Sequence, residues 1–227
     1  MKRIAVIPAR SGSKGLKDKN IKVMAGKPLM AYTIEAALSS GVFDEVMVST
    51  DSEKYAEIAR TYGASVPFMR SEETSGDKAS TWDTVREVIG NYRKLGFEFD
   101  VAAVLQPTSP LRTAEDIRGG MELFDKNNAS AVIGVCKLEH SINICNTLGE
   151  NNSMNGFFDS NVSGRRQDAG TYYRINGALY IQRVSDLMSK KNLYGEGSYA
   201  YIMDKKSSID VDDEMDFKMA EAVMNWV

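Results

Sequence analysis

The loop between Arg10 and Asn20 combines the residue types that bind polyphosphate. It contains four basic side chains and a single acidic one, Asp18. Gly12 and Gly15 allow its backbone to turn the amide groups inward, and its serines add further donors. Lysine, arginine and converging amides are the groups that hold phosphate oxygens in proteins. The loop therefore indicates an anion-binding site, with a solvated basic turn as the alternative interpretation.

Spacing excludes the two common phosphate-binding loops. A P-loop requires Gly-x-x-x-x-Gly-Lys followed by Ser or Thr, whereas here Leu16 follows Gly15. A dinucleotide-binding loop requires Gly-x-Gly-x-x-Gly, of which this chain has only the fragment from Gly12 to Gly15. An anion bound by this loop would therefore be held in a different arrangement, and the solvated basic turn stays an alternative.

A second segment suited to chemistry lies near the C-terminus. Residues 209–216 contain five acidic side chains and no basic one. Asp210 and Asp212 flank Val211, and in an extended chain two such residues point to the same side. A pair of carboxylates on one face suits Mg²⁺, which prefers oxygen ligands and shares its coordination shell with phosphates. Acidic residues at a helix start are often only partners of the helix dipole. We assign that simpler role to Asp213, Glu214 and Asp216.

The basic loop and the residues around it resemble the nucleotide-binding signature of the acylneuraminate cytidylyltransferases, the CMP-sialic acid synthetases. The matching string is IPARSGSKGLKDKNIKVMAGKPL, residues 7–29. Further motifs of that family follow in the same order along nearly the whole chain. They are STD at 49–51, QPTSPLR at 106–112, RQ at 166–167, RINGALY at 174–180 and SIDVD at 208–212.

The resemblance implies an enzyme that joins CTP to the anomeric hydroxyl of a sugar acid and releases pyrophosphate. Such a reaction needs charge neutralisation, a metal ion and in-line positioning rather than covalent chemistry from the protein. It implies Mg²⁺ at Asp210 and Asp212, and Lys19 stabilising charge on the α-phosphate. The residues expected at the nucleotide are Arg10, Ser11, Gly12, Ser13, Lys14, Asn20, Arg70 and Thr81. Arg70 and Thr81 are expected near the base, with a surface charge and a helix cap as their respective alternatives.

The resemblance assigns the remaining motifs to the sugar acid. Gln106 is expected to orient the attacking hydroxyl, because a neutral amide is a poor base; Asp212 or the metal would then provide the route for the proton. Arginine binds a carboxylate bidentately, so Arg166 is expected at the carboxylate of the acid. The other residues expected there are Gln167, Arg174 and Asn176. For Arg174, an ion pair at a strand edge is the alternative.

The hydrophobic pattern predicts the elements that must position these motifs. Short apolar runs predict buried strands at residues 4–7, 45–49, 101–105 and 131–135. Helical spacing predicts helices at residues 28–40, 52–62, 80–95 and 113–127, with Ser80 or Thr81 capping the third and Thr113 with Asp116 capping the fourth. Later in the chain we expect strands at 174–181 and 199–203 and a helix at 214–226, and residues 66–70 are strand-like. This alternation is typical of a doubly wound, mostly parallel α/β sheet; the resemblance implies its nucleotide-diphospho-sugar transferase-like form.

We expect residues 1–227 to form a single nucleotidyltransferase domain interrupted by an inserted arm at residues 137–169. That stretch is rich in Asn, Ser and Gly and has no periodicity. Connections longer than about 15 residues are uncommon unless they have a function. By resemblance, the arm is expected to join two chains into a homodimer and to contribute to the sugar site.

Composition excludes several other classes of protein. The chain has 28 Lys and Arg against 31 Asp and Glu, a net charge of −3, which disfavours a nucleic-acid partner. No apolar run reaches the roughly 18 residues of a membrane span, and the apolar start is too short for a signal peptide. We therefore expect a cytoplasmic protein with no membrane partner. Cys136 and Cys145 are too few for a disulfide framework or a zinc site.

Two other functions stay open at this point. One is activation of 3-deoxy-manno-octulosonate, although the SGSKGL loop and the Arg166–Gln167 motif favour the sialic-type branch. The other is a non-catalytic nucleotide-binding protein on the same fold, against which the presence of Lys19, Asp210 and Asp212 argues. The sequence does not specify which nonulosonic acid is used.

Overall fold

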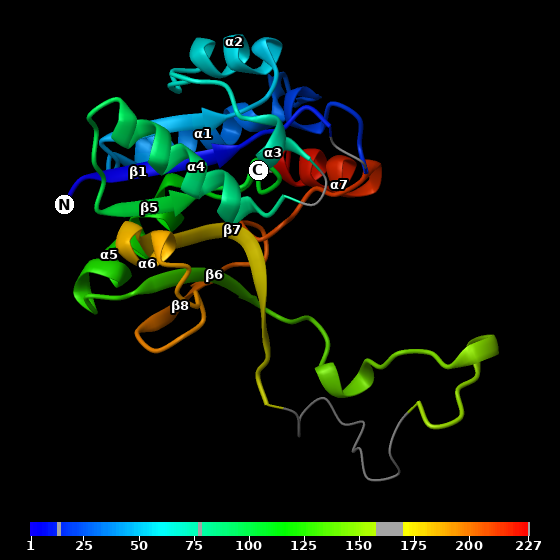
Figure 1. Cartoon of the computed structure of the whole chain (residues 1–227). Coiled ribbons are helices and arrows are strands. Elements are labelled where there is room, and N and C mark those ends of the chain that lie inside the picture. Colours follow the sequence, from blue (N-terminus) through cyan, green and yellow to red (C-terminus); the bar gives the residue numbers. More distant parts are fainter. Residues whose placement is uncertain (13–14, 77–78, 158–169, 227) are drawn as a thin grey trace.

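A computed structural model describes residues 1–12, 15–76, 79–157 and 170–226 and contains one six-stranded sheet with helices on both faces (Figure 1). In spatial order its strands are β4 (Glu45–Ser49), β1 (Arg3–Pro8), β5 (Val101–Val104), β7 (Tyr173–Arg183), β6 (Ala131–Lys137) and β8 (Ser198–Met203). A separate two-stranded ribbon is formed by β2 (Val23–Met24) and β3 (Lys27–Pro28). The helices are α1 (Leu29–Ser40), α2 (Glu53–Thr61), α3 (Glu72–Ser75), α4 (Thr81–Lys94), α5 (Ala114–Lys126), α6 (Val184–Met188) and α7 (Glu214–Met224).

The sheet is mostly parallel, as the sequence predicts. β1 runs parallel to β4 and β5, and β6 runs parallel to β8. β7 lies between β5 and β6 and is antiparallel to both. Parallel strands end at a common edge, which is where open α/β sheets bind ligands.

Each face of the sheet is covered by its own helices, which explains the continuous apolar runs of the strands. Ala5 and Ile7 of β1 point to the face covered by α1, α2 and α5. Ile4 and Val6 point to the opposite face, against α4 and α6. α7 packs on a smaller cluster that includes Val211 and Leu29.

The helix ends follow the capping signals. Gly41 closes α1 with φ +67°, Ser80 accepts the first-turn amide of α4, and Thr113 forms a capping box with Asp116 at the start of α5. Asp213 caps α7 and, with Asp216, completes a second capping box. The simpler role predicted for the acidic residues after Asp212 is confirmed for these two.

One predicted element is wrong. Residues 66–70 do not form a strand; only Ser65, just before them, makes an isolated parallel bridge, to Met47 of β4. Pro67, two residues after Ser65, has no amide hydrogen to continue the pairing. The chain then runs irregularly to Arg70, whose amide donates to the Thr50 carbonyl at 2.9 Å.

β7 contains a bulge that the sequence pattern does not reveal. Tyr180 pairs with Ile133 of β6, but two residues later Val135 pairs with Ile175, so three extra residues of β7 are accommodated between the two pairs. Gly177 lies within the bulge with φ +76°, a conformation that favours glycine. Bulges of this kind re-aim side chains beside functional sites.

The predicted insertion leaves the body of the molecule between β6 and β7 (Figure 1). Its described part, residues 138–157, contains the short 3₁₀ turns η2 (Ile142–Ile144) and η3 (Glu150–Asn152). Several of its apolar side chains are exposed: Ile142, Ile144, Leu148 and Met154. Across the described ranges, no helix is both long enough and apolar enough to cross a membrane.

Candidate active site

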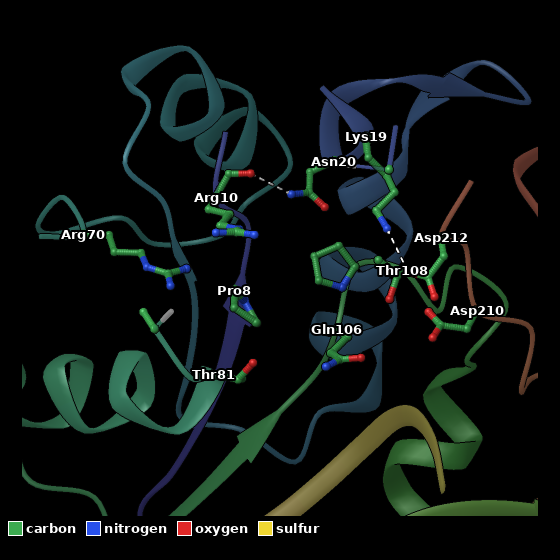
Figure 2. Close-up of a pocket in the computed structure, with 13 residues that line it drawn as sticks. Pro8, Arg10, Lys19, Asn20, Arg70, Thr81, Gln106, Thr108, Asp210 and Asp212 are labelled. Atoms are coloured by element: carbon green, nitrogen blue, oxygen red, sulfur yellow. Dashed lines mark hydrogen bonds and ion pairs between the residues drawn. The ribbon is translucent and has the colours of Figure 1, made fainter. Parts of the chain in front are cut away.

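A cavity of about 470 Å³ lies at the edge of the sheet where β1 and β5 end (Figure 2). Eight of the residues singled out from the sequence line it: Arg10, Lys19, Asn20, Arg70, Thr81, Gln106, Asp210 and Asp212. Arg70 and Thr81 lie at one end and the two aspartates at the other (Figure 2). Segments that are almost 200 residues apart in the sequence therefore form one site.

Lys19 joins the basic loop to the acidic segment. Its Nζ donates to the Val211 carbonyl at 2.6 Å and to Asp212 Oδ1 at 3.2 Å. The Lys19 side chain is only 12% exposed. Asp18, just before it, has the left-handed φ of 53° and accepts a hydrogen bond from the Tyr55 hydroxyl at 3.0 Å. This contact fixes the turn that aims Lys19 into the cavity.

Arg10 and Asn20 hold the two ends of the basic loop together. The buried Asn20 donates from Nδ2 to the Arg10 carbonyl at 3.1 Å. The Arg10 guanidinium reaches the Ser75 carbonyl at 3.3 Å, across the cavity edge. The hydrogen bond between Asn20 and Arg10 thus holds the start and the end of the loop together, and Arg10 and Lys19 line the cavity from these two ends.

Arg70 and Thr81 form the opposite end. Burial lowers the pKa of the Arg70 guanidinium, which donates to the Thr74 carbonyl. Its Nε is buried with no hydrogen-bond partner in the described part of the chain. Because Ser80 is the helix cap, the cap interpretation of Thr81 is wrong, and Thr81 lines the cavity as the first residue of α4.

Asp210 and Asp212 face the same cavity while Val211 between them is fully buried. The Val211 amide donates to the Thr108 carbonyl at 2.8 Å, which attaches the segment to the loop after β5. The predicted same-side arrangement is confirmed, although residues 209–212 do not belong to a strand.

The two carboxylates differ in environment. Burial, followed by the nearby charge of Asp212, raises the pKa of Asp210, although a hydrogen bond from Thr108 and the charges of Lys19 and Arg174 act in the opposite direction. Asp210 Oδ1 is buried without a hydrogen-bond partner among the described residues. The Asp212 side chain is 80% exposed.

This donor set fits Mg²⁺. The described residues contain no group of three or more His, Cys, Asp or Glu side chains able to hold a metal, so a fully protein-bound ion is not indicated there. Mg²⁺ instead usually takes one or two carboxylates and completes its shell with phosphate oxygens and water. Two neighbouring carboxylates, one with a buried and unpaired oxygen, match that requirement.

Gln106 follows β5 and packs against the β7 bulge. A Cβ atom on Gly177 would lie 2.6 Å from Gln106 Oε1 and 3.8 Å from Asp210 Oδ2. Only glycine allows the Gln106 amide to approach the bulge this closely. The bulge therefore brings Gln106 next to the acidic pair.

Four predicted site residues do not line the cavity. The amide and hydroxyl of Ser11 donate to the Asp51 carboxylate at 2.8 and 3.0 Å, and Gly12 is exposed. Arg174 donates to the Ser208 carbonyl at 3.1 Å, and Asn176 donates to the Ser208 hydroxyl at 2.9 Å. Arg174 and Asn176 thus anchor the segment that carries the aspartates. The predictions for Ser13, Lys14, Arg166 and Gln167 fall outside the described residues.

Gly15 lines the cavity without having been predicted as a site residue, and Asp51 holds the basic loop through Ser11. Asp51 ends the STD motif directly after β4, where a carboxylate at a parallel strand end is the available signal. Gly15 lines the cavity, and a Cβ atom on it would lie 2.6 Å from the Asp212 carbonyl oxygen. The sequence around Gly15 does not indicate that this residue lies close to Asp212, which is far away along the chain.

Comparison with known proteins gives similar sequences over nearly the whole chain. A family model described as cytidylyltransferase matches residues 4–216. The N-acylneuraminate cytidylyltransferase of Escherichia coli O18:K1:H7 is 40% identical over 96% of this chain and 51% of its own length. The CMP-N,N'-diacetyllegionaminic acid synthase of Legionella pneumophila is 35% identical over 99% of this chain and 97% of its own length.

The chain spans about half the length of the N-acylneuraminate cytidylyltransferases that it matches. A solved structure of CMP:2-keto-3-deoxy-manno-octonic acid synthetase complexed with CTP is similar in fold, with a TM-score of 0.75 at 18% identity over 100% of this chain and 99% of the other. The fold is therefore the nucleotide-diphospho-sugar transferase-like one. With a family model that covers most of its length, this chain belongs to the cytidylyltransferase family.

Proposed function

We propose that the protein transfers CMP from CTP to the anomeric hydroxyl of a nonulosonic, sialic-type acid and releases pyrophosphate. The relatives named for N-acylneuraminate and legionaminic acid support the substrate class. The observation that carries the proposal is the contact of Lys19 with Asp212 in one cavity. It joins a basic loop, suited to a triphosphate, to a carboxylate pair suited to a metal.

CTP lies along the cavity in this proposal. Arg10, Lys19 and Asn20 line the part next to the basic loop and contact the phosphates, with Lys19 stabilising the charge that develops on the α-phosphate. Arg70 and Thr81 line the far end and meet the base. A half-buried guanidinium with an unpaired Nε suits a ring carbonyl, because the donor is already desolvated.

Asp210 and Asp212 hold Mg²⁺ in this proposal. When bound, the ion would neutralise phosphate charge and withdraw electron density from the α-phosphate. Thr108 and Val211 fix the carboxylates through the contacts described above. Lys19 would exchange its contact with Asp212 for one with the nucleotide.

Gln106 orients the acid. Its amide oxygen packs against Gly177 of the β7 bulge, near Asp210, where the amide can donate to or accept from the anomeric hydroxyl without removing the proton. Asp212 is exposed to the cavity and is the side chain best placed to take that proton. Arg166 and Gln167 would bind the carboxylate of the acid.

The homodimer is part of the proposal. Exposed apolar side chains on the arm continue onto the outer part of β7, at Tyr173 and Ile175, and an exposed apolar surface of this kind indicates an interface. A second copy of the chain would cover it, and the arm of that copy would deliver Arg166 to the sugar site.

The proposal is tested by release of pyrophosphate from CTP and Mg²⁺ in the presence of single acids. The panel is N-acetylneuraminate, legionaminic and pseudaminic acids, and 3-deoxy-manno-octulosonate. We expect turnover with at least one of the first three, at a rate that exceeds the rate with the fourth, and none with Asp210→Ala. Binding of CTP without turnover on any acid would instead support a silent nucleotide-binding protein.

A further inference from the structure

Arg112 is a buried arginine beside the cavity that the proposed reaction does not use. It ends the QPTSPLR motif and is 2% exposed. Its Nη1 donates to two backbone carbonyls, that of Gln106 at 3.2 Å and that of Ala178 at 2.7 Å. One guanidinium nitrogen thus joins the end of β5 to the bulge of β7.

The bulge depends on side chains for its backbone hydrogen bonds. Ala178 pairs with neither β5 nor β6 in the strand register. Its amide donates to Asn176 Oδ1 at 3.1 Å, and its carbonyl accepts from Arg112. Buried backbone groups of this kind must be paired, because leaving one unpaired costs about 1–3 kcal/mol. Arg112 therefore helps to hold the bulge in its observed shape.

The shape of the bulge sets the place of the Gln106 side chain. Gly177, directly before Ala178, is the residue against which Gln106 Oε1 packs, with Asp210 Oδ2 close by. The Gln106 carbonyl also accepts from the Ser109 amide at 3.3 Å and the Thr33 hydroxyl at 3.4 Å. Ser109 follows β5 and Thr33 lies in α1. Of these three donors, Arg112 is the one that also donates to the bulge in the described part of the chain.

A side chain that only filled the space at position 112 would not need a charged guanidinium group. Nε and Nη2 of Arg112 are buried with no hydrogen-bond partner in the described ranges. The nearby negative charge that favours its charged form belongs to Asp116, which the capping box already uses. Burying a charge without close pairing is expensive. The buried charge of Arg112 lies where the end of β5 and the bulge of β7 are held together.

We propose that Arg112 is a positioning residue for the acid substrate: by joining the Gln106 and Ala178 carbonyls, it holds the Gln106 amide beside Asp210. The inference rests on the proposed role of Gln106 in orienting the attacking hydroxyl. Arg112 itself touches neither substrate.

The test compares R112M, R112K, Q106A and the double variant R112M/Q106A. R112M should lower kcat/KM for the acid about ten- to hundredfold, since a displacement near 1 Å can have that effect, while the Kd for CTP stays within about twofold. R112K should recover part of the loss, because its ammonium can still donate to both carbonyls. In the Q106A background, R112M should have less than about a twofold effect, because the two residues act through one amide.

Arg183 provides the matched control. It also donates to backbone carbonyls, to Ala129 and Asn128, both at 2.9 Å, but at the end of β7. R183M should lower the Tm without changing kcat/KM for the acid. Equal losses in R112M and R183M would overturn the inference, and so would a full multiplicative effect of R112M in the Q106A background.

A readout that needs no turnover separates this inference from the proposed function. The side-chain amide signals of Gln106 can be assigned by NMR from their loss in Q106A. They should shift in R112M, shift less in R112K and stay in place in R183M. If they stay in place in R112M, or if R112M fails to fold and R112K leaves them unmoved, Arg112 does not position Gln106, whichever acid the enzyme uses.

Discussion

At the scale of single residues, the two aspartates of the cavity combine opposite properties. Asp210 is partly buried, and its raised pKa shows that the fold disfavours its charge. Asp212 is exposed and already paired with Lys19. The proposed Mg²⁺ would fit this arrangement, because the ion would offset the buried charge of Asp210 and take the place of Lys19 at Asp212.

Asp210→Asn should raise the Tm of the metal-free protein at neutral pH. Because the folded-state pKa of Asp210 is raised above its unfolded value, the charged carboxylate costs stability at neutral pH. That cost disappears as the pH falls through the raised pKa, so the advantage of the variant should shrink toward acidic pH. Thermal melts in EDTA between pH 7 and pH 4 measure this difference. Asp212→Asn is the control and should give no gain, because Asp212 is exposed; a lower Tm for Asp210→Asn at neutral pH would contradict the account.

Gly177→Ala should damage acid turnover more than stability. Alanine in the left-handed region costs roughly 1–2 kcal/mol, and the new Cβ would also meet Gln106 Oε1. We expect kcat/KM for the acid to fall more than about tenfold with little change in CTP affinity. Gly96→Ala is the matched control, since Gly96 has φ +84° and a Cβ atom there would meet nothing within 4 Å among the described residues. Denaturant unfolding should show a similar loss for both variants. Equal activity in the two variants would mean that the approach of Gln106 to the bulge is unimportant.

At the scale of elements, local signals predicted the fold well. The apolar run at 45–49 coincides with β4, and the caps Ser80, Thr113 and Asp213 start three helices. The prediction of a strand at residues 66–70 was wrong, because their apolar character is strand-like but Pro67 prevents pairing. The β7 bulge could not be predicted, because it is defined by the register against another strand and not by local composition.

The residue types of the candidate site could be predicted from the sequence, but the directions in which some of their side chains point could not. The basic loop and the acidic pair converge as expected. The loop follows β1 and the pair lies in the segment after β8, and parallel strands end at a common edge of the sheet. Arg174 and Asn176 were placed at the sugar from their motif, whereas the structure uses both to anchor Ser208. A motif specifies which groups are present, while the strand register decides where they point.

Gly15→Ala should weaken CTP and Mg²⁺ binding together. The new Cβ would press on the carbonyl of Asp212, which belongs to backbone and cannot simply rotate away. Calorimetric titration should show both affinities reduced by at least about fivefold, or roughly 1 kcal/mol. A Cβ atom on Gly12, in the same loop, would meet no atom of the described residues within 4 Å, so Gly12→Ala should bind normally. Loss of CTP affinity in Gly12→Ala alone would contradict the contact between the loop and the acidic segment.

At the scale of the whole molecule, the charge distribution matters more than the total. A net charge of −3 conceals a basic loop and an acidic segment that the sheet brings to one edge. The arm leaves this same edge of the sheet at the end of β6 and extends away from the body (Figure 1). The proposed nucleotide site thus lies in the body, whereas the proposed association of two chains involves the arm.

Replacing residues 139–171 by a short glycine-containing turn tests this division. Leu138 and Tyr172 already approach each other, with the Leu138 amide 2.9 Å from the Tyr172 carbonyl, so a hairpin can close there. We expect a folded protein that binds CTP but is monomeric by light scattering and does not turn over the acid. A shortened chain that remains dimeric and active would show that the arm has neither role.

The central claim is that one cavity joins CTP to a nonulosonic acid through the α-phosphate. Its most direct measurement is ³¹P NMR of a reaction containing the protein, CTP, Mg²⁺ and each acid of the panel. The account predicts that, for at least one sialic-type acid, the CTP signals are replaced by one phosphodiester of CMP with the acid and an equal amount of pyrophosphate. Unchanged CTP with every acid, or release of free CMP without the phosphodiester, would contradict it.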